Sequence, residues 1–537
     1  MSVLSVENLT VALPKGADRA HAVKDVSFAL NAGEILCVVG ESGSGKSMAA
    51  NAVMGLLPDL VTVEHGKAMF EGQDLLSLPE SSRQSLRGEK LAMIFQEPMT
   101  ALNPLMRVGE QIEEVFEAHG KLSGKERHQR VIALAEEVGL PDPEAIVRAY
   151  PFQLSGGQRQ RAMIAMALAL APTILIADEP TTALDVTTQA QILDLIANLQ
   201  RERGMAVMFI THDFGVVAEI ADRVIVMRYG EIVEAGSADQ VLKDPQHDYT
   251  KRLLEAVPSD VVRPRKTPPD TPMLEVKNLM KTFGKSGGLF RQRRVVHAVN
   301  DVTLTINRAE ILGLVGESGS GKSTVGRCIV RLVEPDGGSV VIDGEEMTTL
   351  DAAALRRARR RAQMVFQDPY ASLNPRTKIA RAITQGPIAM GTPRAEAVAD
   401  AKRLLETVGL DASAADRYPH EFSGGQRQRI GIARALAMRP ELIIADEAVS
   451  ALDVSIQAQI LDLLRDLRER FGLSILFITH DLRVAAQLCD RIAVMQQGAI
   501  VEMGPVVDVF LRPQHEYTQN LLAAVPGATW QGAEAAP

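Results

Sequence analysis

The stretch Gly40-Glu41-Ser42-Gly43-Ser44-Gly45-Lys46-Ser47 occurs twice in the chain, and its second copy is Gly316-Glu317-Ser318-Gly319-Ser320-Gly321-Lys322-Ser323. Each copy follows a short apolar run, Ile35–Val39 or Ile311–Val315, and precedes a segment able to form a helix. This order predicts a strand, a glycine loop and a helix. The glycines let the backbone curl so that N–H groups and the helix N-terminus point at a phosphate chain. One copy alone could be an ordinary glycine turn, but two copies in the same context make that alternative negligible.

The last residues of each loop carry the chemistry that a bound phosphate chain needs. Lys46 and Lys322 can reach the β- and γ-phosphates, and the hydroxyls of Ser47 and Ser323 can hold Mg²⁺. The next residue of the second copy, Thr324, joins the candidate nucleotide-binding residues. We expect the first helix to run from Lys46 to about Leu57.

Composition excludes several classes of function. The net charge of −9 and the pI of about 5.7 give no support to a nucleic-acid partner. The three cysteines (Cys37, Cys328 and Cys489) lie far apart, which argues against a zinc or iron–sulfur site and predicts small buried side chains in a reducing compartment. The longest apolar run, Ala162–Ala177, is broken by Pro172 and is shorter than the about 20 residues of a membrane-spanning helix. With no signal-peptide pattern at the start, we expect a protein that is soluble by itself.

The apolar pattern predicts α/β architecture. Ser2–Val11 and Ala22–Leu30 alternate as strands do, whereas Ile174–Ala177 and Val207–Ile210 are continuous apolar runs typical of buried strands. Helical patterns separate these runs, and a charged helical insert is expected over about 109–149. Alternating strands and helices predict a mainly parallel sheet that binds ligands at the carboxyl ends of its strands.

In each half an Asp-Glu pair directly follows a predicted buried strand. In the first half that strand is Ile174–Ala177. Asp178 and Asp446 can hold Mg²⁺, which prefers oxygen ligands and keeps several waters. Glu179 and Glu447, one residue on, can orient or polarise an attacking water. A lone Asp-Glu could be a simple charge pair at a strand end, but the preceding glycine loop disfavours that interpretation.

A histidine follows a Phe-Ile-Thr strand in both halves. His212 lies 33 residues after Glu179, and His480 lies 33 residues after Glu447. A single histidine is more often structural than functional. Its recurrence at the same distance from the glutamate favours a role in the site.

The repeat divides the chain into two domains of about 260 residues each. We expect a first domain over 1–258, a linker over 259–272, a second domain over 273–527 and a flexible tail over 528–537. The linker carries four prolines and little apolar content.

Together these motifs resemble the nucleotide-binding subunits of ABC transporters, twice and over nearly the whole chain. The matching motifs are the glycine loops, Gln96 and Gln367 of the Q-loops, the signature segments Leu154–Gln158 and Phe422–Gln426, the acidic pairs, the loops Ala183–Asp185 and Ala451–Asp453, and the switch histidines. The signature is the most specific, since other P-loop NTPases lack it. The resemblance implies two tandem P-loop NTPase domains, each with a mainly parallel sheet core, an antiparallel β subdomain and a helical insert.

The resemblance also implies how the halves cooperate. In the family two such domains close head to tail on two ATP molecules, and the two halves are expected to pair within this one chain. Ser155 and Gly157 of the first signature, like Ser423 and Gly425 of the second, would contact the γ-phosphate held by the other half. Gln96 and Gln367 would contact Mg²⁺ or the attacking water and pass movement to the insert.

A narrower resemblance points to the dipeptide, oligopeptide and nickel importer branch. It rests on Phe95–Pro104 and Phe366–Pro375 and on the half-ends Asp244–Leu254 and Arg512–Leu522. The fused arrangement is similar to the tandem ATP-binding proteins of glutathione and peptide importers. Physical reasoning alone gives the half-ends only a short amphipathic helix with a Pro-Gln-His start, and no role.

The implied function is that of an ATPase that converts ATP and water to ADP and phosphate and so drives import of peptides or a related small solute. Its expected cofactors are ATP and Mg²⁺. Its expected partners are two membrane permease subunits and an extracytoplasmic solute-binding protein, with no nucleic acid. It would lie on the cytoplasmic face of the bacterial inner membrane and touch the membrane only through the permeases. The cargo, whether dipeptide, oligopeptide, glutathione or nickel, stays open.

Three departures from the family pattern carry expectations. Some members of this branch have a C-terminal cysteine cluster, and its absence predicts no iron–sulfur group. Ala448 stands where the first half has Pro180, which leaves the catalytic glutamate in place. Phe283 can stack on adenine in the second half, whereas Thr10–Leu13 holds no aromatic residue. Because base stacking is worth about 1–3 kcal/mol, we expect weaker ATP binding at the first site.

Two alternatives from other classes are disfavoured. A soluble tandem ABC ATPase acting on ribosomes or nucleic acid would need a long charged helical linker or Cys-x-x-Cys zinc modules, neither of which the sequence has. A nucleotide switch without turnover would have lost a glutamate or a signature in one half. Both halves keep both.

Overall fold

The protein is described here from a computed structural model that covers residues 2–182, 184–257, 269–284, 295–450 and 452–527. Most of the expected linker 259–272, the expected tail 528–537 and the loop residues Ala183 and Ala451 lie outside the described residues. The last residue of the expected linker, Pro272, already begins a strand. The expected domain boundaries stay a prediction.

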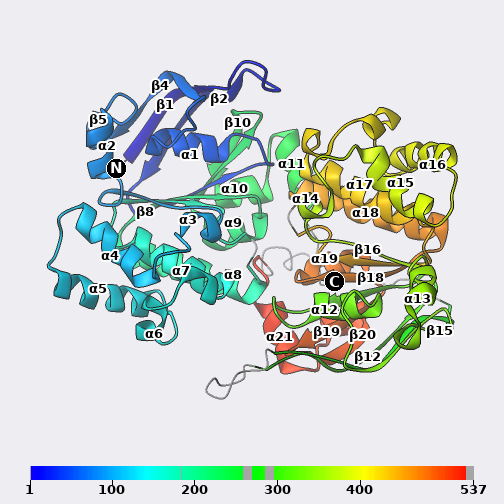
Figure 1. Ribbon diagram of the computed structural model, residues 1–537. Coiled ribbons are helices and arrows are strands. Elements are labelled where there is room, and N and C mark those ends of the chain that lie inside the picture. The colour runs from blue at the N-terminus through cyan, green and yellow to red at the C-terminus, as the bar shows by residue number, and fades with distance from the viewer. Residues whose placement is uncertain (1, 183, 258–268, 285–294, 451, 528–537) are drawn as a thin grey trace. The chain divides into compact units, whose positions relative to one another are not determined.

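The chain forms two compact units, one mainly from Met1–Leu184 with Thr188–Val257 and the other mainly from Pro258–Val525. Each unit contains a six-stranded sheet, a four-stranded antiparallel sheet and a set of insert helices (Figure 1). This architecture confirms the predicted α/β class with two tandem domains of the same design.

The core sheet of the first unit has the strand order β10-β9-β3-β8-β7-β6, and only its β9–β10 pair is antiparallel. Its strands are β3 (Ile35–Val39), β6 (Leu91–Ile94), β7 (Ile174–Asp178), β8 (Ala206–Thr211), β9 (Arg223–Arg228) and β10 (Glu231–Ser237). All residues of β3, β6, β7 and β8 are buried, which explains their continuous apolar runs.

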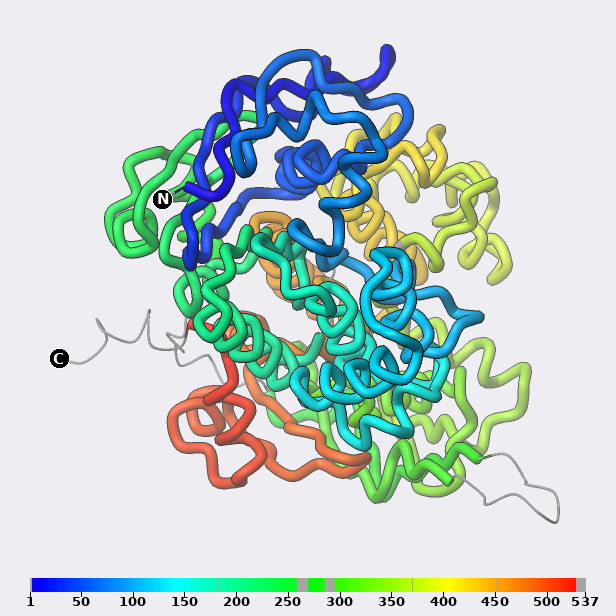
Figure 2. The backbone as a smooth tube through the Cα atoms, turned by 90° about the vertical axis from the view of Figure 1, so that its left-hand side faces the viewer, coloured from blue at the N-terminus to red at the C-terminus, as the bar shows by residue number. Residues whose placement is uncertain are grey.

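The antiparallel sheet of the first unit has the order β2-β1-β4-β5. Its strands are β1 (Ser2–Ala12), β2 (His21–Asn31), β4 (Thr62–Phe70) and β5 (Gln73–Asp74). Near the end of the unit, β9 and β10 lie beside this sheet. The Lys24 N–H of β2 donates at 2.8 Å to the carbonyl of Gly230, which connects β9 and β10. Figure 2 shows this arrangement, with green β9 and β10 beside the blue start of the chain.

The helices of the first unit fall into a core set and an insert set. They are α1 (Lys46–Met54), α2 (Glu80–Leu86), α3 (Pro98–Ala101), α4 (Val108–Ala118), α5 (Gly124–Glu137), α6 (Pro143–Val147), the 3₁₀ turn η1 (Pro151–Gln153), α7 (Gly156–Ala167), α8 (Val186–Arg203), α9 (Phe214–Ile220), α10 (Ala238–Lys243) and α11 (Asp248–Glu255). The insert expected over about 109–149 is α4 to α6.

The first helix is shorter than the sequence suggested. α1 ends at Met54 rather than near Leu57, because Gly55 adopts a left-handed conformation with φ of 63°. Its N–H donates back to the carbonyls of Asn51 and Ala52, which closes the last turn.

The second unit repeats the design. Its antiparallel sheet, in the order β12-β11-β14-β15, comprises β11 (Pro272–Phe283), β12 (Val296–Asn307), β14 (Gly337–Ile342) and β15 (Glu345–Glu346). Its core sheet, in the order β16-β17-β18-β13-β19-β20, comprises β16 (Ala362–Val365), β17 (Leu442–Asp446), β18 (Ser474–Thr479), β13 (Ile311–Val315), β19 (Arg491–Gln496) and β20 (Ala499–Pro505).

The helices of the second unit correspond to those of the first. They are α12 (Lys322–Ile329), η2 (Met347–Thr349), α13 (Ala352–Ala358), α14 (Pro369–Ser372), α15 (Ile379–Ala389), α16 (Arg394–Thr407), η3 (Ala412–Asp416), η4 (Pro419–Glu421), α17 (Gly424–Leu436), α18 (Val454–Phe471), α19 (Leu482–Leu488), α20 (Val506–Leu511) and α21 (Glu516–Ala523). Within the described ranges, no helix combines the length and apolarity needed to cross a bilayer.

Adjacent residues of the core strands face opposite sides of the second unit's sheet. Ile311 and Ile443 belong to a cluster with the insert helices, whereas Leu312 and Ile444 belong to a cluster with the antiparallel sheet. Strand side chains alternate between the faces, so one sheet holds both layers together. The three cysteines are buried, as predicted.

A buried glutamate fixes the start of the central strand in each unit. Glu310 is 0% exposed, accepts the Asn307 N–H at 2.6 Å and pairs with Arg491 at 3.0 Å. Glu34 makes the corresponding ion pair with Arg223 at 2.9 Å. The carboxylate therefore joins the turn before the central strand to the first residue of its neighbour.

We expect Glu310→Ala to lower the free energy of unfolding of the second unit by about 2–3 kcal/mol, because it leaves a partly buried N–H and a partly buried guanidinium without their acceptor. Thermal unfolding followed by calorimetry should show a fall of about 5 °C or more. The control is Asp462→Ala, which breaks a pair whose side chains are 68% and 39% exposed and should cost less than about 1 kcal/mol. Equal shifts for the two variants would contradict this assignment.

Candidate functional site

The two glycine loops have nearly identical geometry. Each connects the end of a buried central strand, β3 or β13, to a helix whose first residue is the lysine. A Cβ atom on Gly45 would lie 2.4 Å from the Ala22 carbonyl oxygen, and one on Gly321 would lie 2.0 Å from that of Ala298. With φ of 103° and 107°, these positions admit only glycine. The loop is thus pressed against the antiparallel sheet.

Each loop lysine is buried and holds the loop's own carbonyls. Lys46 Nζ donates to Gly40 O at 2.7 Å and to Glu41 O at 3.0 Å, and Lys322 makes the same two contacts at 2.7 and 2.8 Å. Burial lowers the pKa of Lys322 from its ordinary value. The ammonium group is therefore positioned at the loop and can exchange these carbonyls for phosphate oxygens.

A serine hydroxyl and an aspartate meet beside each loop. Ser47 Oγ donates to Asp178 Oδ1 at 2.9 Å, and Ser323 Oγ donates to Asp446 Oδ1 at 2.7 Å. Burial raises the pKa of both aspartates. Two oxygen donors at this separation suit neighbouring positions around octahedral Mg²⁺, whose ligand distances are about 2.0–2.1 Å. The residues present therefore fit the predicted metal.

Each predicted catalytic glutamate is the centre of a small polar network. In the first unit, Gln96 Nε2 donates to Glu179 Oε2 at 2.9 Å, His212 Nδ1 lies 3.4 Å from Oε1, and Thr182 Oγ1 donates at 3.0 Å. Although burial raises the pKa of Glu179, hydrogen bonding and charge from His212, with Lys46 and Thr182, lower it to about 2. The carboxylate is therefore an anion at neutral pH.

The second unit repeats the network. Gln367 Nε2 donates to Glu447 Oε2 at 2.7 Å, and His480 Nδ1 lies 3.6 Å from the same oxygen. Burial opposes the shift, but His480 and Lys322 lower the pKa of Glu447 below its ordinary value. The structure thus brings together each half's glycine loop, acidic pair, glutamine and histidine.

Both glutamates have a backbone conformation that is costly for a residue with a side chain. Glu179 and Glu447 each have φ of 47°. Their N–H groups donate to the carbonyls of Ile210 and Ile478 at 2.9 Å, which ties each glutamate to the neighbouring strand. A strained residue persists only where the surroundings fix it, and such residues cluster at functional sites.

Each signature segment is a helix N-terminus. Ser155 accepts the Gln158 N–H at 3.2 Å and caps α7, and Ser423 accepts the Gln426 N–H at 3.3 Å and caps α17. A Cβ atom on Gly157 would lie 2.6 Å from Thr188 Cγ2. The glycine is therefore needed for packing against α8, in addition to its predicted phosphate contact.

The candidate adenine-stacking residue lies at the end of β11. Phe283 is 44% exposed and pairs with Val296 in the antiparallel sheet. Val296 lies two residues before Ala298, and Gly321 of the glycine loop packs against Ala298. In the first unit the Leu13 N–H donates to Ala20 O, two residues before Ala22. Leu13 therefore occupies the position of Phe283, consistent with the asymmetry read from the sequence.

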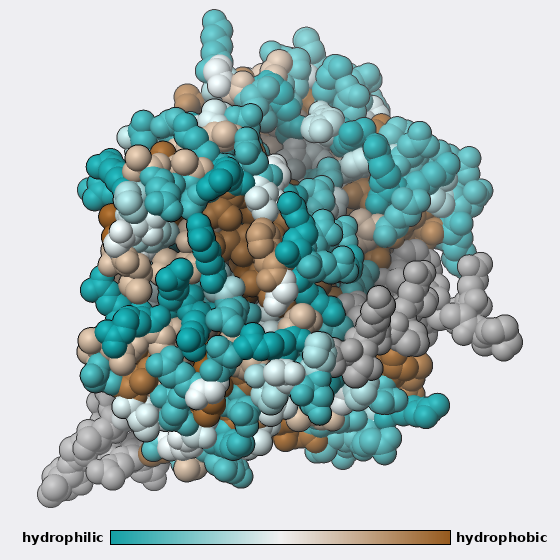
Figure 3. Space-filling view, turned by 90° about the vertical axis from the view of Figure 1, so that its right-hand side faces the viewer, coloured by the Kyte–Doolittle hydropathy of each residue, from teal (hydrophilic) through white to brown (hydrophobic). Residues whose placement is uncertain are grey.

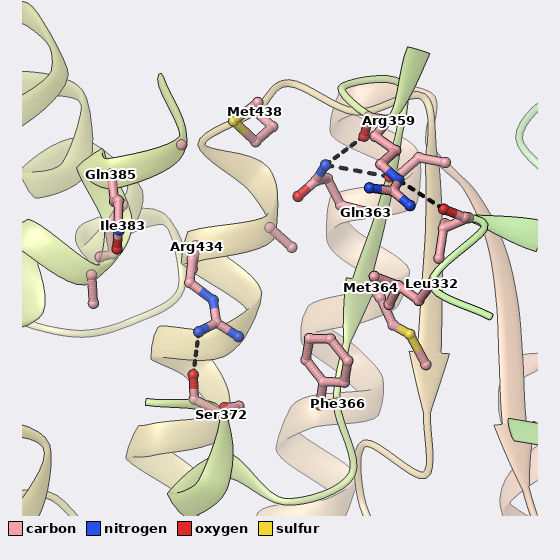
Figure 4. A pocket seen from close by; sticks show the side chains of 15 residues that line it. Leu332, Arg359, Gln363, Met364, Phe366, Ser372, Ile383, Gln385, Arg434 and Met438 are labelled. Atoms are coloured by element: carbon pink, nitrogen blue, oxygen red, sulfur yellow. Dashed lines mark hydrogen bonds between the residues drawn. The ribbon is translucent and has the colours of Figure 1, made fainter. Parts of the chain in front are cut away.

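A pocket of about 410 Å³ adjoins the Q-loop of the second unit. It lies between β16, α15 and α17, and Phe366, the residue before Gln367, forms part of its wall (Figure 4). Arg434 points into it and donates to the Ser372 carbonyl. Apolar side chains also gather in a hollow with hydrophilic borders on this side of the second unit (Figure 3).

Sequence reasoning missed two tyrosines that contact the glycine loops. Tyr249 on α11 and Tyr517 on α21 place their hydroxyls 3.2 and 3.1 Å from the N–H groups of Glu41 and Glu317. The recurrence of Pro-Gln-His-x-Tyr-Thr in both half-ends was the available signal.

Comparison with known proteins places these features in a family. The ABC transporter model matches residues 23–182 and 299–450, and the model "oligopeptide/dipeptide transporter, C-terminal region" matches 233–296 and 501–534. The glutathione import ATP-binding protein GsiA of Escherichia coli O157:H7 is 50% identical over 560 residues, covering 98% of this chain and 90% of the relative. The protein of the same name from Escherichia coli K12 shows the same identity and coverage.

Among solved structures, a dimeric post-hydrolysis state of the ATP-binding cassette MJ0796 bound to ADP and phosphate is 32% identical. It covers 44% of this chain and 99% of its own, with a TM-score of 0.40. The family assignment rests on the sequence matches. Because the ABC transporter model covers more than half of the chain and a relative is 50% identical over 98% of it, the chain belongs to the ABC transporter family.

Proposed function

We propose that this chain is the ATP-hydrolysing subunit of an importer for glutathione or similar short peptides. The observation that carries the proposal is the 50% identity to glutathione import ATP-binding proteins over 98% of the chain. The matches to the oligopeptide/dipeptide transporter region at both half-ends support it. The two complete sets of polar residues at the loops support hydrolysis in both halves.

The glycine loops would hold the phosphates of ATP. Loop N–H groups and the N-termini of α1 and α12 favour an anion. Lys46 and Lys322 would move from the loop carbonyls to the β- and γ-phosphates. Ser42, Ser44, Ser318, Ser320 and the other loop residues, with Thr324, would line the phosphate chain.

Mg²⁺ would be held by Ser47 and Asp178 in the first unit and by Ser323 and Asp446 in the second, with Gln96 and Gln367 nearby. Bound there, it would neutralise charge on the β- and γ-phosphate oxygens. Glu179 and Glu447, which are ionised at neutral pH, would orient the attacking water and accept its proton. His212 and His480 would keep these carboxylates charged and oriented.

The glutamines would connect hydrolysis to transport. Gln96 touches the catalytic carboxylate and lies at the start of the path to the insert helices, between β6 and α3. A side chain placed between the nucleotide and a movable insert is a two-state element that ATP can bias. The pocket beside Gln367 would receive a helix of a permease subunit, because its wall continues directly into the Q-loop.

The proposed partners are two permease subunits and an extracytoplasmic solute-binding protein, and the proposed location is the cytoplasmic face of the bacterial inner membrane. The pairing of the two halves, with each signature segment completing the other half's site, stays a prediction.

The cargo is tested by reconstituting the chain with its permeases in vesicles and adding the binding protein with labelled glutathione. ATP-dependent uptake of glutathione, or of a short peptide that competes with it, is the expected result. ATP hydrolysis without uptake of either would overturn the proposed cargo while leaving the ATPase intact.

We expect Glu179→Gln and Glu447→Gln each to trap ATP at one site and to lower steady-state turnover of the assembled transporter at least tenfold, because a general base contributes about 10²–10⁴. Trapped nucleotide is measured after gel filtration, and turnover by phosphate release. Glu231→Gln, on a side chain that is 52% exposed on β10, is the matched control. Near-wild-type turnover of either variant would exclude two working sites.

We expect the double variant Gln96→Ala with Gln367→Ala to keep ATP affinity within about tenfold, or about 1.4 kcal/mol. Uptake should fall much further, because the lost contact links the carboxylate to the insert more than it anchors nucleotide. Affinity and uptake are compared in the same vesicles. A loss of uptake only in proportion to affinity would show that the glutamines are ligands and nothing more.

We expect Leu332→Glu to reduce uptake at least tenfold while the basal ATPase activity of the free chain stays within about twofold, because a charge in the pocket opposes burial of an apolar helix. Leu332 lines the pocket and is 53% exposed, so the substitution is compatible with folding. Phe471→Glu, at a side chain of the same 53% exposure at the end of α18, is the control. Equal uptake by both variants would exclude the pocket as the docking site.

A further inference from the structure

The last helix of each unit contacts the second residue of that unit's glycine loop. In the first unit the Tyr249 hydroxyl accepts the Glu41 N–H and donates to the Glu41 carboxylate, both at 3.2 Å. In the second unit the Tyr517 hydroxyl accepts the Glu317 N–H at 3.1 Å, and the nearby Glu317 carboxylate adds to the burial that raises the pKa of Tyr517. The contact between a buried tyrosine hydroxyl and the loop N–H thus occurs in both units.

The Pro-Gln-His start of the last helix is what aims the tyrosine. Glu234 on β10 accepts the N–H groups of Gln246 and His247 at 2.7 and 3.2 Å. His247 Nδ1 then accepts the Tyr249 N–H at 3.1 Å and caps α11. The segment is therefore fixed to the core sheet by a carboxylate before it reaches the loop.

The second unit has the same anchor. Glu502 on β20 accepts the N–H groups of Gln514 and His515 at 2.9 and 3.1 Å. His515 Nδ1 accepts the Tyr517 N–H at 3.1 Å. Two independent copies of one arrangement, each ending at a glycine loop, point to a role at that loop.

The tyrosines are rigid and neutral. Tyr249 and Tyr517 are 4% and 8% exposed, and the Arg228 guanidinium lies 4.8 Å from the centre of the Tyr249 ring. Burial raises the pKa of each tyrosine to about 12. Each hydroxyl therefore keeps its proton and can donate and accept at the same time.

The restrained residue is also the one that holds the loop lysine. The Glu41 carbonyl accepts from Lys46 Nζ, while the N–H of the same residue donates to Tyr249. The Glu41 N–H belongs to the same peptide group as the Gly40 carbonyl, which accepts from Lys46 Nζ at 2.7 Å, so the tyrosine fixes one of the two peptides that the lysine must leave when phosphate arrives. A loop that is already ordered loses less entropy when it binds a ligand.

We propose that Tyr249 and Tyr517 are positioning residues that preorganise the glycine loops for ATP, and that this is the function of the Pro-Gln-His half-ends. This inference rests on the proposal that the loops hold the phosphates of ATP. Neither tyrosine needs to touch the nucleotide.

The test uses Tyr249→Phe and Tyr517→Phe in the full chain, since phenylalanine keeps the packed ring and removes only the hydroxyl. Calorimetric titration with ATPγS should show binding weakened about three- to tenfold at the altered site, the effect of losing hydrogen bonds of ordinary strength. The KM for ATP should rise in step, with kcat changed less than twofold. A general loss of folded protein would instead lower activity without moving KM.

Hydrogen exchange provides a second, nucleotide-free measurement. Tyr249→Phe should speed amide exchange over residues 40–47 and leave 316–323 unchanged, and Tyr517→Phe should do the reverse. Glu234→Ala, which releases the anchor but keeps the tyrosine, should shift exchange over 40–47 in the same direction. The control is Tyr229→Phe, at a ring that is 70% exposed and lies under the same Arg228, which should change neither exchange nor affinity.

Lys46→Ala with Lys322→Ala separates this inference from the proposed site. If the lysine variant abolishes ATPγS binding while the tyrosine variants match wild type in affinity and exchange, the positioning role is overturned and the site stands. If the lysine variant binds ATPγS normally, the proposed site and the positioning role fail together.

Discussion

Glu179 and Glu447 follow directly after the ends of their strands with side chains only 13% and 12% exposed, and a largely buried carboxylate stays charged only when donors and positive charge surround it. In the first unit those groups come from three elements, namely Gln96 after β6, His212 after β8 and Lys46 at the start of α1. The charge of one carboxylate is therefore compensated by groups from two strand ends and from the glycine loop, which meet around it. Displacing any of them would leave charge uncompensated, so the two strand ends and the glycine loop are held in one arrangement.

The two units act as an internal comparison, because one chain solves the same physical problem twice. The contacts of the lysine, the serine–aspartate pair and the glutamine–glutamate pair recur with distances that differ by 0.2 Å or less. The surroundings differ more: Leu13 replaces Phe283 beside the loop, and Gln496 ends β19 where Arg228 ends β9. The polar contacts at the loop are thus the same in both units, while the aromatic and charged side chains around the loop differ.

Most of the fold and of the candidate site could be predicted because the deciding patterns are local. A continuous apolar run such as Ile174–Ala177, followed at once by acidic residues, predicts a buried strand with carboxylates at its carboxyl end. The predicted end of α1 near Leu57 is wrong because Gly55 ends the helix as a left-handed cap. The contact between Tyr249 and Glu41 spans 208 residues, and no local spacing records which distant segments a sheet brings together. The repeated Pro-Gln-His-x-Tyr-Thr segment is visible in the sequence. The contact that its tyrosine makes depends on the order of the strands in the sheet.

In the first unit, two side chains at the candidate site are held with unequal strength. On one side, Gln96 is exposed and holds Glu179 through a single hydrogen bond. On the other side, Tyr249 is 4% exposed, makes two hydrogen bonds to Glu41 and is covered by Arg228. Breaking the exposed single contact costs less than displacing a buried ring with two bonds. In the proposed mechanism, a change of nucleotide would therefore leave the half-end fixed to the loop and move the insert helices α4 to α6.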